Sequence, residues 1–417
     1  MQFPDRLTVL FLLILNFAIS QSIESAYGLG LNKSSLHTST IGSGGAGLIP
    51  TFHQGASIDN ISSWPNLGST FISVSYETQS SSYEQSAKSS IYSGISGLQF
   101  IAPFKDRFAF GISLKPANTI NTRLMTDTVS ITYNNIPLKS SKFFSAGGGI
   151  IKGSIGISMP LSQRFGMGIA ISNYFGSSRD EQSIYVEPYN YRLFNIRSFE
   201  GVTYSIDMSG NIFSNQGRNL TLFSKILFTP KPINAILYTF DMYEDRNNNF
   251  AFDAADYPNE LDVDTTSLSD IYSPFELGLG LTYNFNEFLY AFSEYQSFKD
   301  FGNNINLNSI FKDKINNHHQ VSMGFLRFGN PNSNSWQDQL TLRFGINQTK
   351  YQYYLSQSSV IENSISFGFG FKFGLIGNQI DLSYRLGNRE GLNLKETIQN
   401  LNISISLGDI WFLKRRN

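Results

Sequence analysis

The segment of this chain best suited to bind an ion is an acidic stretch near its middle. Over 241–264 it carries eight acidic residues and one basic residue. Oxygen-bearing side chains stand at positions 1, 3, 5, 9 and 12 of a twelve-residue loop: Asp245, Asn247, Asn249, Asp253 and Asp256. That spacing matches a calcium loop of the EF-hand type, because hard cations bind carboxylate and amide oxygens.

The same loop departs from the EF-hand pattern at two positions. Phe250 replaces the turn glycine, and Asp256 is shorter than the usual glutamate at position 12. No helical pattern flanks the loop on either side. The spacing predicts calcium in an extracellular loop, where the ion would rigidify the loop and take no part in catalysis. A solvated acidic loop is the alternative.

Catalytic chemistry has little support in this chain. It has no cysteine, which excludes disulfides, thiolate catalysis and cysteine-bound metals. Its four histidines are His37, His53, His318 and His319. A hydrolase would need a histidine beside a serine or an aspartate, and adjacent histidines on a strand point to opposite faces. We therefore expect no enzyme and no required cofactor, with a barrel hydrolase using His318 or His319 as the least favoured class.

The elements that must carry these residues are strands. Residues 365–373 read Ile-Ser-Phe-Gly-Phe-Gly-Phe-Lys-Phe, so five large apolar side chains share one face of a period-two strand. Charged residues make up 15% of the chain and aromatic residues 14%. Alternation of this kind is typical of strands with lipid on one side and a lumen on the other. It predicts an all-β fold, an antiparallel transmembrane β-barrel.

Fourteen segments repeat this alternation, and they predict a barrel of about 14 strands. The predicted strands lie at 70–77, 91–103, 107–115, 147–160, 164–174, 200–213, 218–229, 274–285, 287–297, 319–328, 338–350, 363–373, 378–387 and 400–412. Short turns alternate with long polar loops, as in outer-membrane barrels. The predicted long loops are 78–90, 116–146, 175–199, 230–273, 298–318, 351–362 and 388–399.

Charged residues identify the inner face of the barrel. Lysine or arginine facing the middle of a bilayer costs ~2–4 kcal/mol, so such residues should line the lumen. Four lumen cations are candidates to bind a ligand carboxylate: Lys115, Arg343, Lys372 and Arg385. Alternatively they pair with Asp207, Glu276 and Asp381 and hold the N-terminal segment, which we favour because buried charges are normally paired.

The two ends of the chain differ from the barrel pattern. Arg6, the apolar run 7–19 and the small-residue site at 18–20 predict a signal peptide over 1–20. Residues 21–68 do not alternate and are rich in small residues, which predicts an N-terminal hatch or plug; a disordered periplasmic leader is the alternative. The barrel would occupy 69–412, and 413–417 would form a basic periplasmic tail.

Several segments together resemble the FadL family of outer-membrane transporters for long-chain fatty acids and other hydrophobic compounds. They are the Gly-Ser-Gly-Gly-Ala-Gly segment at 42–47, Asp-Asn-Ile-Ser-Ser-Trp-Pro at 59–65, the fourteen strands and Gly-Ile-Ser-Leu-Lys-Pro at 111–116. The resemblance implies a hatch inside the lumen that contains Gly42, Gly44, Gly45, Gly47 and Asn60. Asn60 fits the first position of the family's Asn-Pro-Ala motif, whereas Ile61 and Ser62 replace the other two residues.

The family resemblance also implies a function and a place in the cell. It implies passive transport of a hydrophobic small molecule, a fatty acid or a hydrocarbon, with lateral exit beside the third strand. The expected location is the outer membrane of a Gram-negative-type bacterium. The expected partners are membrane lipid, the ligand and the barrel-assembly machinery, whose signal the aromatic end at 407–412 resembles.

The same chain end resembles the last strand of a family subset that includes PorV-type secretion components. A PorV-like barrel that acts as a protein-secretion or scaffold component is therefore the alternative function. Nucleic acid is not an expected partner, because the net charge is −1.

Overall fold

The computed structural model describes most of the 417-residue chain. The described residues are 28–32, 37–84, 89–104, 107–133, 136–215, 217–304, 313–330, 333, 335–374, 378–391 and 394–409. The predicted signal peptide, residues 410–412 of the predicted aromatic end and the basic tail lie outside them. Within these described ranges, no helix is long and apolar enough to cross a membrane.

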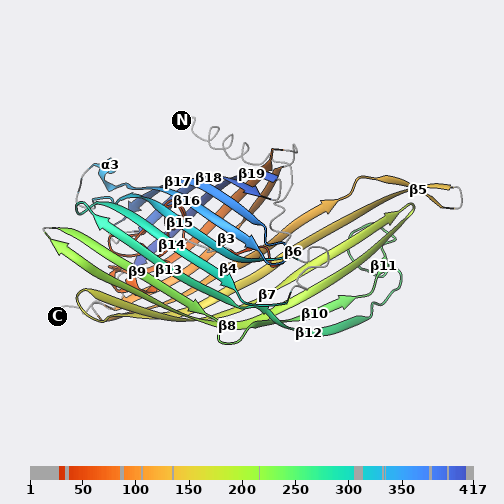
Figure 1. Cartoon of the computed structure of the whole chain (residues 1–417), viewed down its shortest axis with the longest axis horizontal. Helices are drawn as coiled ribbons and strands as arrows, with labels where there is room; N and C mark the ends of the chain where they lie inside the picture. Colours follow the sequence, from red (N-terminus) through yellow and green to blue (C-terminus); the bar gives the residue numbers. More distant parts are fainter. Residues whose placement is uncertain are drawn as a thin grey trace.

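Fourteen antiparallel strands form a closed ring (Figure 1). The ring closes because β19 pairs with β2, from Asp409 opposite Thr70 to Glu396 opposite Tyr83. Every predicted strand is confirmed, so the all-β antiparallel barrel is confirmed as well. In order around the ring the strands are β2 (Thr70–Tyr83), β3 (Ser89–Phe104), β4 (Phe108–Met125), β6 (Ile136–Pro160), β7 (Phe165–Val186), β8 (Tyr189–Asn215), β9 (Arg218–Phe228), β13 (Pro274–Asn284), β14 (Leu289–Asp300), β15 (Ile315–Arg327), β16 (Thr341–Tyr353), β17 (Ser359–Phe373), β18 (Asn378–Gly391) and β19 (Leu394–Asp409).

The predicted loops 116–146 and 175–199 are largely strand, 230–273 contains three strands, and most of 78–90 and 388–399 belongs to ring strands, so the loop interpretation was wrong there. β4, β6, β7 and β8 continue into the first two, where β5 (Val129–Tyr133) also pairs with β6. The third contains β10 (Ile233–Phe240), β11 (Tyr243–Glu244) and β12 (Val263–Tyr272), with β10 between β8 and β12. We call these extensions with β5 and β10–β12 the wing, which projects from one end of the ring (Figure 1). Beyond the lipid both strand faces meet polar surroundings, so the alternation that marks a membrane strand fades.

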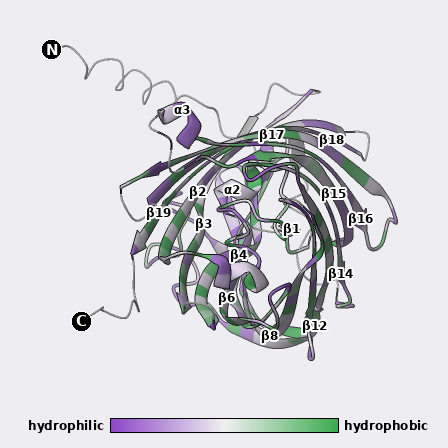
Figure 2. Ribbon diagram, turned by 90° about the vertical axis from the view of Figure 1, so that its left-hand side faces the viewer, coloured by the Kyte–Doolittle hydropathy of each residue, from purple (hydrophilic) through white to green (hydrophobic). Residues whose placement is uncertain are grey.

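The outer surface of the ring is apolar and its inner surface is polar. On β17, Phe367 and Phe369 are 49% and 51% exposed, whereas Ser366 between neighbouring apolar residues is fully buried. The same alternation of apolar and polar residues runs along the other ring strands (Figure 2). A closed ring pairs the backbone groups of its strands, as a strand in lipid requires.

An inner segment, residues 37–67, lies within the ring (Figure 2). It contains the short helix α2 (Thr38–Ile41) and the 3-10 helix η2 (Ile61–Asn66). Its apolar side chains pack against inward-facing wall residues in two clusters: Phe52, Ala56, Ile58, Ile61, Trp64 and Leu67 with Phe71, Ile101, Ala109 and Ala170, and Ala46, Leu48 and Ile49 with Phe223, Tyr290, Phe292, Leu326 and Phe328. Contact with the wall from inside explains why this segment shows no strand period.

Candidate binding site in the barrel lumen

A cavity of about 130 Å³ lies between the inner segment and the barrel wall. Its charged or titratable lining residues come from six ring strands and the inner segment: Asp59, Lys115, Lys152, Asp207, Lys225, Glu276 and His318. The lining also contains uncharged polar side chains such as Gln99 and Ser154, and apolar or aromatic ones: Leu48, Ile58, Ile61, Trp64, Ile101, Tyr174 and Phe298. Inward-facing positions of neighbouring strands bring these residues together, although they lie far apart along the chain.

Two ion pairs stand in the lining of this cavity. Lys115 of β4 forms a short ion pair with Asp59 of the inner segment. Lys225 of β9 pairs with Glu276 of the adjacent strand β13 at 2.9 Å. Asp59 also accepts hydrogen bonds from the backbone N–H of His37 and the hydroxyl of Thr40, at 2.9 and 2.8 Å. The first pair therefore ties the wall to the fold of the inner segment itself.

Wall side chains bind the backbone of the inner segment at several points. The Glu294 carboxylate accepts hydrogen bonds from the backbone N–H groups of Gly47 and Leu48, both at 2.9 Å. The Nε of Arg343 donates to the carbonyl of Thr51 at 2.7 Å. Buried backbone groups need such partners, because an unpaired one costs free energy. The irregular segment thus obtains from the wall the hydrogen bonds that a helix or sheet would supply.

The predicted hatch residues lie where the inner segment meets the wall. A Cβ added to Gly42 would lie 2.7 Å from the Cα of Gly368 on β17, so the two backbones approach too closely for a side chain. Gly44 and Gly45 have φ angles of +70° and +77°, which favour glycine. Asn60 caps η2 by accepting a hydrogen bond from Ser62 N–H, and its Nδ2 donates to the Leu48 carbonyl. The close backbone approach and the positive φ angles explain why glycine occupies these positions of the inner segment.

Of the four cations predicted to bind a carboxylate, Lys115 alone lines this cavity. Arg343 is buried against Asp381 at 2.8 Å. Arg385 forms a short pair with Glu362, and Lys372 is half-buried on β17. Binding of a ligand by these four stays a prediction.

Sequence reasoning did not single out Lys152, Lys225 and Glu294. All three occupy inward positions of predicted strands or their immediate neighbours. Extending the face assignment along β6, β9 and β14 would have found them.

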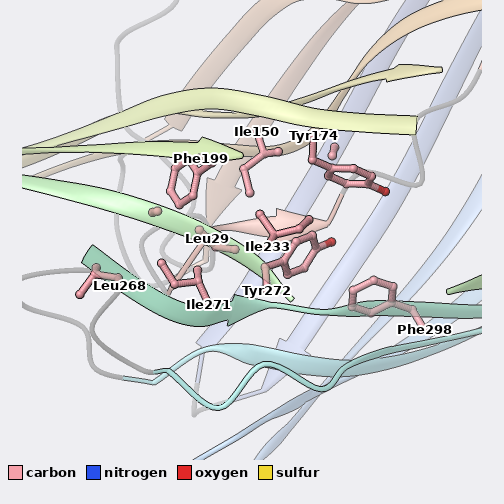
Figure 3. Close-up of a cluster of buried hydrophobic side chains, with 11 residues drawn as sticks. Leu29, Ile150, Tyr174, Phe199, Ile233, Leu268, Ile271, Tyr272 and Phe298 are labelled. Atoms are coloured by element: carbon pink, nitrogen blue, oxygen red, sulfur yellow. The ribbon is translucent and has the colours of Figure 1, made fainter. Parts of the chain in front are cut away.

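An outer apolar cluster lies next to the cavity and includes residues of the wing strands β10 and β12 (Figure 3). Its members are Leu29, Ala117, Ile150, Tyr174, Phe199, Ile233, Ala235, Leu268, Ile271, Tyr272 and Phe298. Tyr174, Phe298 and Ala117 belong to both the cluster and the cavity lining. The lumen therefore changes from an apolar layer to an ionic one over the width of a few side chains.

The hydrogen-bonded ladder between β3 and β4 ends beside this layer. It runs only from Phe104 opposite Phe108 to Leu98 opposite Leu114. Past that point two residues of β4 pair with β1 (Leu31–Asn32) in place of β3, while β6 pairs with β4 along nearly its whole length. The ladder between β4 and β6 is irregular between Pro116 and Asn118, and Lys115, Pro116 and Ala117 line the cavity. Residues 89–97 of β3 and 115–125 of β4 do not pair with each other, although Asn118 and Thr119 pair with β1, and we call these residues the unpaired section.

The acidic loop, residues 245–256, lies in the wing between β11 and β12. Asp245 and Asp256 are buried, and Asp245 pairs with Arg192 at 3.1 Å. Asp253 is half-buried and accepts hydrogen bonds from the side-chain amides of Asn247 and Asn249. The part of the chain that the structure describes contains no cluster of three or more His, Cys, Asp or Glu side chains arranged to hold a metal. Calcium binding by this loop stays a prediction.

The adjacent histidines on β15 point to opposite faces, as predicted. His318 is buried, stacks on Phe298 with ring centroids 4.7 Å apart, and lines the cavity. His319 is on the exposed face, and its Nδ1 lies 2.9 Å from the hydroxyl of Tyr295.

The remaining two histidines belong to the inner segment. The ring nitrogens of His37 lie 2.8 Å from the Ser39 hydroxyl and 3.0 Å from the Ser73 hydroxyl. The His53 ring packs edge-on against Phe52, with the ring centroids 4.3 Å apart.

The sequence of this chain matches a known family model, and its fold is similar to that of solved outer-membrane proteins. A family model described as BamG matches residues 6–417. A Pseudomonas aeruginosa FadL homologue superposes with a TM-score of 0.56 at 13% identity, covering 91% of this chain and 98% of that one. The CymD monoaromatic hydrocarbon channel has the same TM-score at 9% identity, with 93% and 100% covered. No curated protein matches the sequence. The FadL-like barrel fold is thus confirmed.

Proposed function

The chain belongs to the BamG family. We propose that it passes small hydrophobic molecules passively across the outer membrane. Placement in that membrane follows from the closed antiparallel ring with its apolar outer band, an architecture that spans a bilayer by pairing backbone groups between neighbouring strands. The structurally similar CymD is a monoaromatic hydrocarbon channel. For this chain we infer the broader class, hydrophobic compounds, with fatty acids and hydrocarbons as the finer candidates.

One observation supports the proposal most: the outer apolar cluster adjoins the unpaired section of β3 and β4. Ala117 belongs to the cluster, lines the cavity and follows the last β3–β4 pair by three residues. A hydrophobic molecule that enters from the wing end would bind to the apolar side chains of this cluster, because transfer of its apolar surface from water to an apolar environment is favourable.

Further descent through the lumen would be unfavourable for such a molecule. The ionic layer below the cluster contains the Lys115–Asp59 and Lys225–Glu276 pairs. An apolar ligand there would separate polar groups from their partners without replacing their hydrogen bonds. The inner segment, which we propose to act as a plug, fills the lumen beyond. The route of lowest cost is therefore sideways, through the unpaired section into the lipid.

The direct test is what the barrel carries and what it lets pass. Mass spectrometry of detergent-extracted protein should find a bound apolar compound, and a deletion strain should take up labelled toluene or oleate more slowly than its parent. Restoring the gene should restore the rate. Normal uptake in the deletion strain, together with no apolar molecule in the purified protein, would contradict the proposal.

The wing favours a second candidate function, a barrel that binds proteins as a secretion or scaffold component. It carries exposed apolar side chains outside the lipid-facing ring, among them Met125 and Val263 at 68% and 46% exposure. This function predicts that crosslinking in cells captures secreted proteins or barrel-assembly components on the wing. It also predicts unchanged uptake of oleate in the deletion strain.

A further inference from the structure

We propose that the lumen cavity binds a small zwitterion, a molecule that carries one ammonium group and one carboxylate a few bonds apart. Its size class is that of glycine or alanine. The proposal does not depend on hydrophobic transport, because it concerns the ionic layer rather than the apolar cluster.

One cation and one anion among the charged residues that line the cavity form no ion pair with the others. Three lysines and three carboxylates face it: Lys115, Lys152, Lys225, Asp59, Asp207 and Glu276. Two ion pairs use four of them. Lys152 and Asp207 remain, and among the described residues neither takes part in an ion pair. The ring of Tyr174 lies beside the Lys152 ammonium, with its centroid 5.6 Å from the Nζ.

Buried polar atoms in the same cavity lack partners. Asp207 is 1% exposed; its Oδ2 accepts a hydrogen bond from Ile61 N–H at 3.0 Å, whereas its Oδ1 has no partner within the described chain. The Nδ1 of His318, a residue 5% exposed, is likewise without one. Buried polar groups normally have a hydrogen-bond partner, and a polar ligand in the cavity would supply one.

Charge balance selects a zwitterion over a single ion. The six charged groups sum to zero, and a lone cation at Asp207 would leave Lys152 uncompensated in a cavity with net positive charge. A lone anion at Lys152 would leave the opposite imbalance. Unbalanced charge is costly away from water. A zwitterion places its ammonium at Asp207 and its carboxylate at Lys152, and it adds no net charge.

The cavity volume restricts the ligand to a few heavy atoms. The cavity holds about 130 Å³. A cavity of about 150 Å³ holds benzene, a molecule of six heavy atoms, when its walls are apolar. Here the walls present lysine, carboxylate and hydroxyl groups, which an apolar molecule of that size would leave unpaired. Glycine, alanine and β-alanine fit both the volume and the lining.

The experiment is calorimetric titration of the full-length protein in detergent with alanine, propionate and ethylammonium. The last two each carry one half of the charge pattern. Alanine should bind. Each half-ligand should bind at least about tenfold more weakly, because it can pair with only one of the two charged residues. Equal binding of propionate or ethylammonium would overturn the proposal, as would the absence of alanine binding, which would mean that water alone fills the cavity.

Two variants locate the binding in the cavity. Lys152→Met and Asp207→Asn should each weaken alanine binding by about tenfold or more. Lys142→Met, an exposed lysine on the wing part of the same strand, is the matched control and should leave binding unchanged. Gel migration of unboiled against boiled samples verifies the fold of each variant. Unchanged binding in either cavity variant would overturn the proposal; if a variant does not fold, the half-ligand comparison on the native chain decides.

Discussion

Glu294 of β14 accepts a hydrogen bond at 2.9 Å from the backbone N–H of Leu48, a residue 246 positions away in the sequence. The same carboxylate also accepts from the N–H groups of Gly47 and Ile49. One wall side chain therefore satisfies three consecutive backbone donors of the inner segment. This carboxylate is therefore one of the main attachment points of the segment, beside Arg343 and Asp207.

Glu294→Ala should loosen the inner segment within the barrel. It leaves three buried N–H groups without an acceptor, at a cost of about 1–3 kcal/mol for each group that water does not reach. Single-channel recordings in planar bilayers should show larger and more frequent ion-conducting openings than the native chain. Glu390→Ala, an exposed carboxylate at the outer end of β18, is the control. Identical recordings for Glu294→Ala and the native chain would show that other contacts hold the segment.

Arg343→Met should destabilise the barrel strongly. The arginine and Asp381 form a fully buried ion pair, and removing one partner of such a pair typically costs about 3–5 kcal/mol. The exposed pair of Arg327 and Asp338 gives the control Arg327→Met, with an expected loss below about 1 kcal/mol. Urea unfolding in detergent, followed by gel migration, measures both. Equal unfolding midpoints for the two variants would contradict the burial argument.

Gly42→Ala should push the inner segment away from β17. The added Cβ would lie 2.7 Å from the Cα of Gly368, and overpacking of this kind typically costs about 1–3 kcal/mol. Gly68→Ala is the matched control, since its Cβ would meet no atom within 4 Å. Protease digestion of the folded barrel should cut the inner segment faster in Gly42→Ala alone. Equal digestion of both variants would refute the close-packing account.

The fold was more predictable from sequence than the site, for a physical reason. Contact with lipid requires an apolar residue at every second position of a membrane strand, so the phenylalanines of β17 make that strand recognisable in the sequence. Contacts of the inner segment carry no repeating pattern, and nothing near Asp59 in the sequence indicates that Lys115 will pair with it. The end of the β3–β4 ladder likewise cannot be predicted from the sequence of either strand, because it depends on where the two strands separate in the folded barrel.

The acidic loop of the wing remains a predicted calcium site. Calcium should protect the native chain from protease cleavage within 245–256, because an ion would replace the present hydrogen bonds among the loop side chains. Asp253→Ala should remove the protection; the residue lies between β11 and β12, outside the ring strands, so the barrel itself should be unaffected. Cleavage at the same rate with calcium and with a chelator would leave the solvated-loop interpretation standing.

Lateral exit between β3 and β4 is the central claim, and closing the unpaired section tests it most directly. The chain has no cysteine, so a Ser96→Cys/Pro116→Cys pair can be joined by a short thiol crosslinker without side reactions at other positions. The control is Leu98→Cys/Leu114→Cys, a pair at which the ladder is already closed. Crosslinking the first pair should reduce the uptake of labelled toluene to the rate of a strain without the protein, and crosslinking the control should not change it. Undiminished uptake with the first pair fully crosslinked would contradict the account.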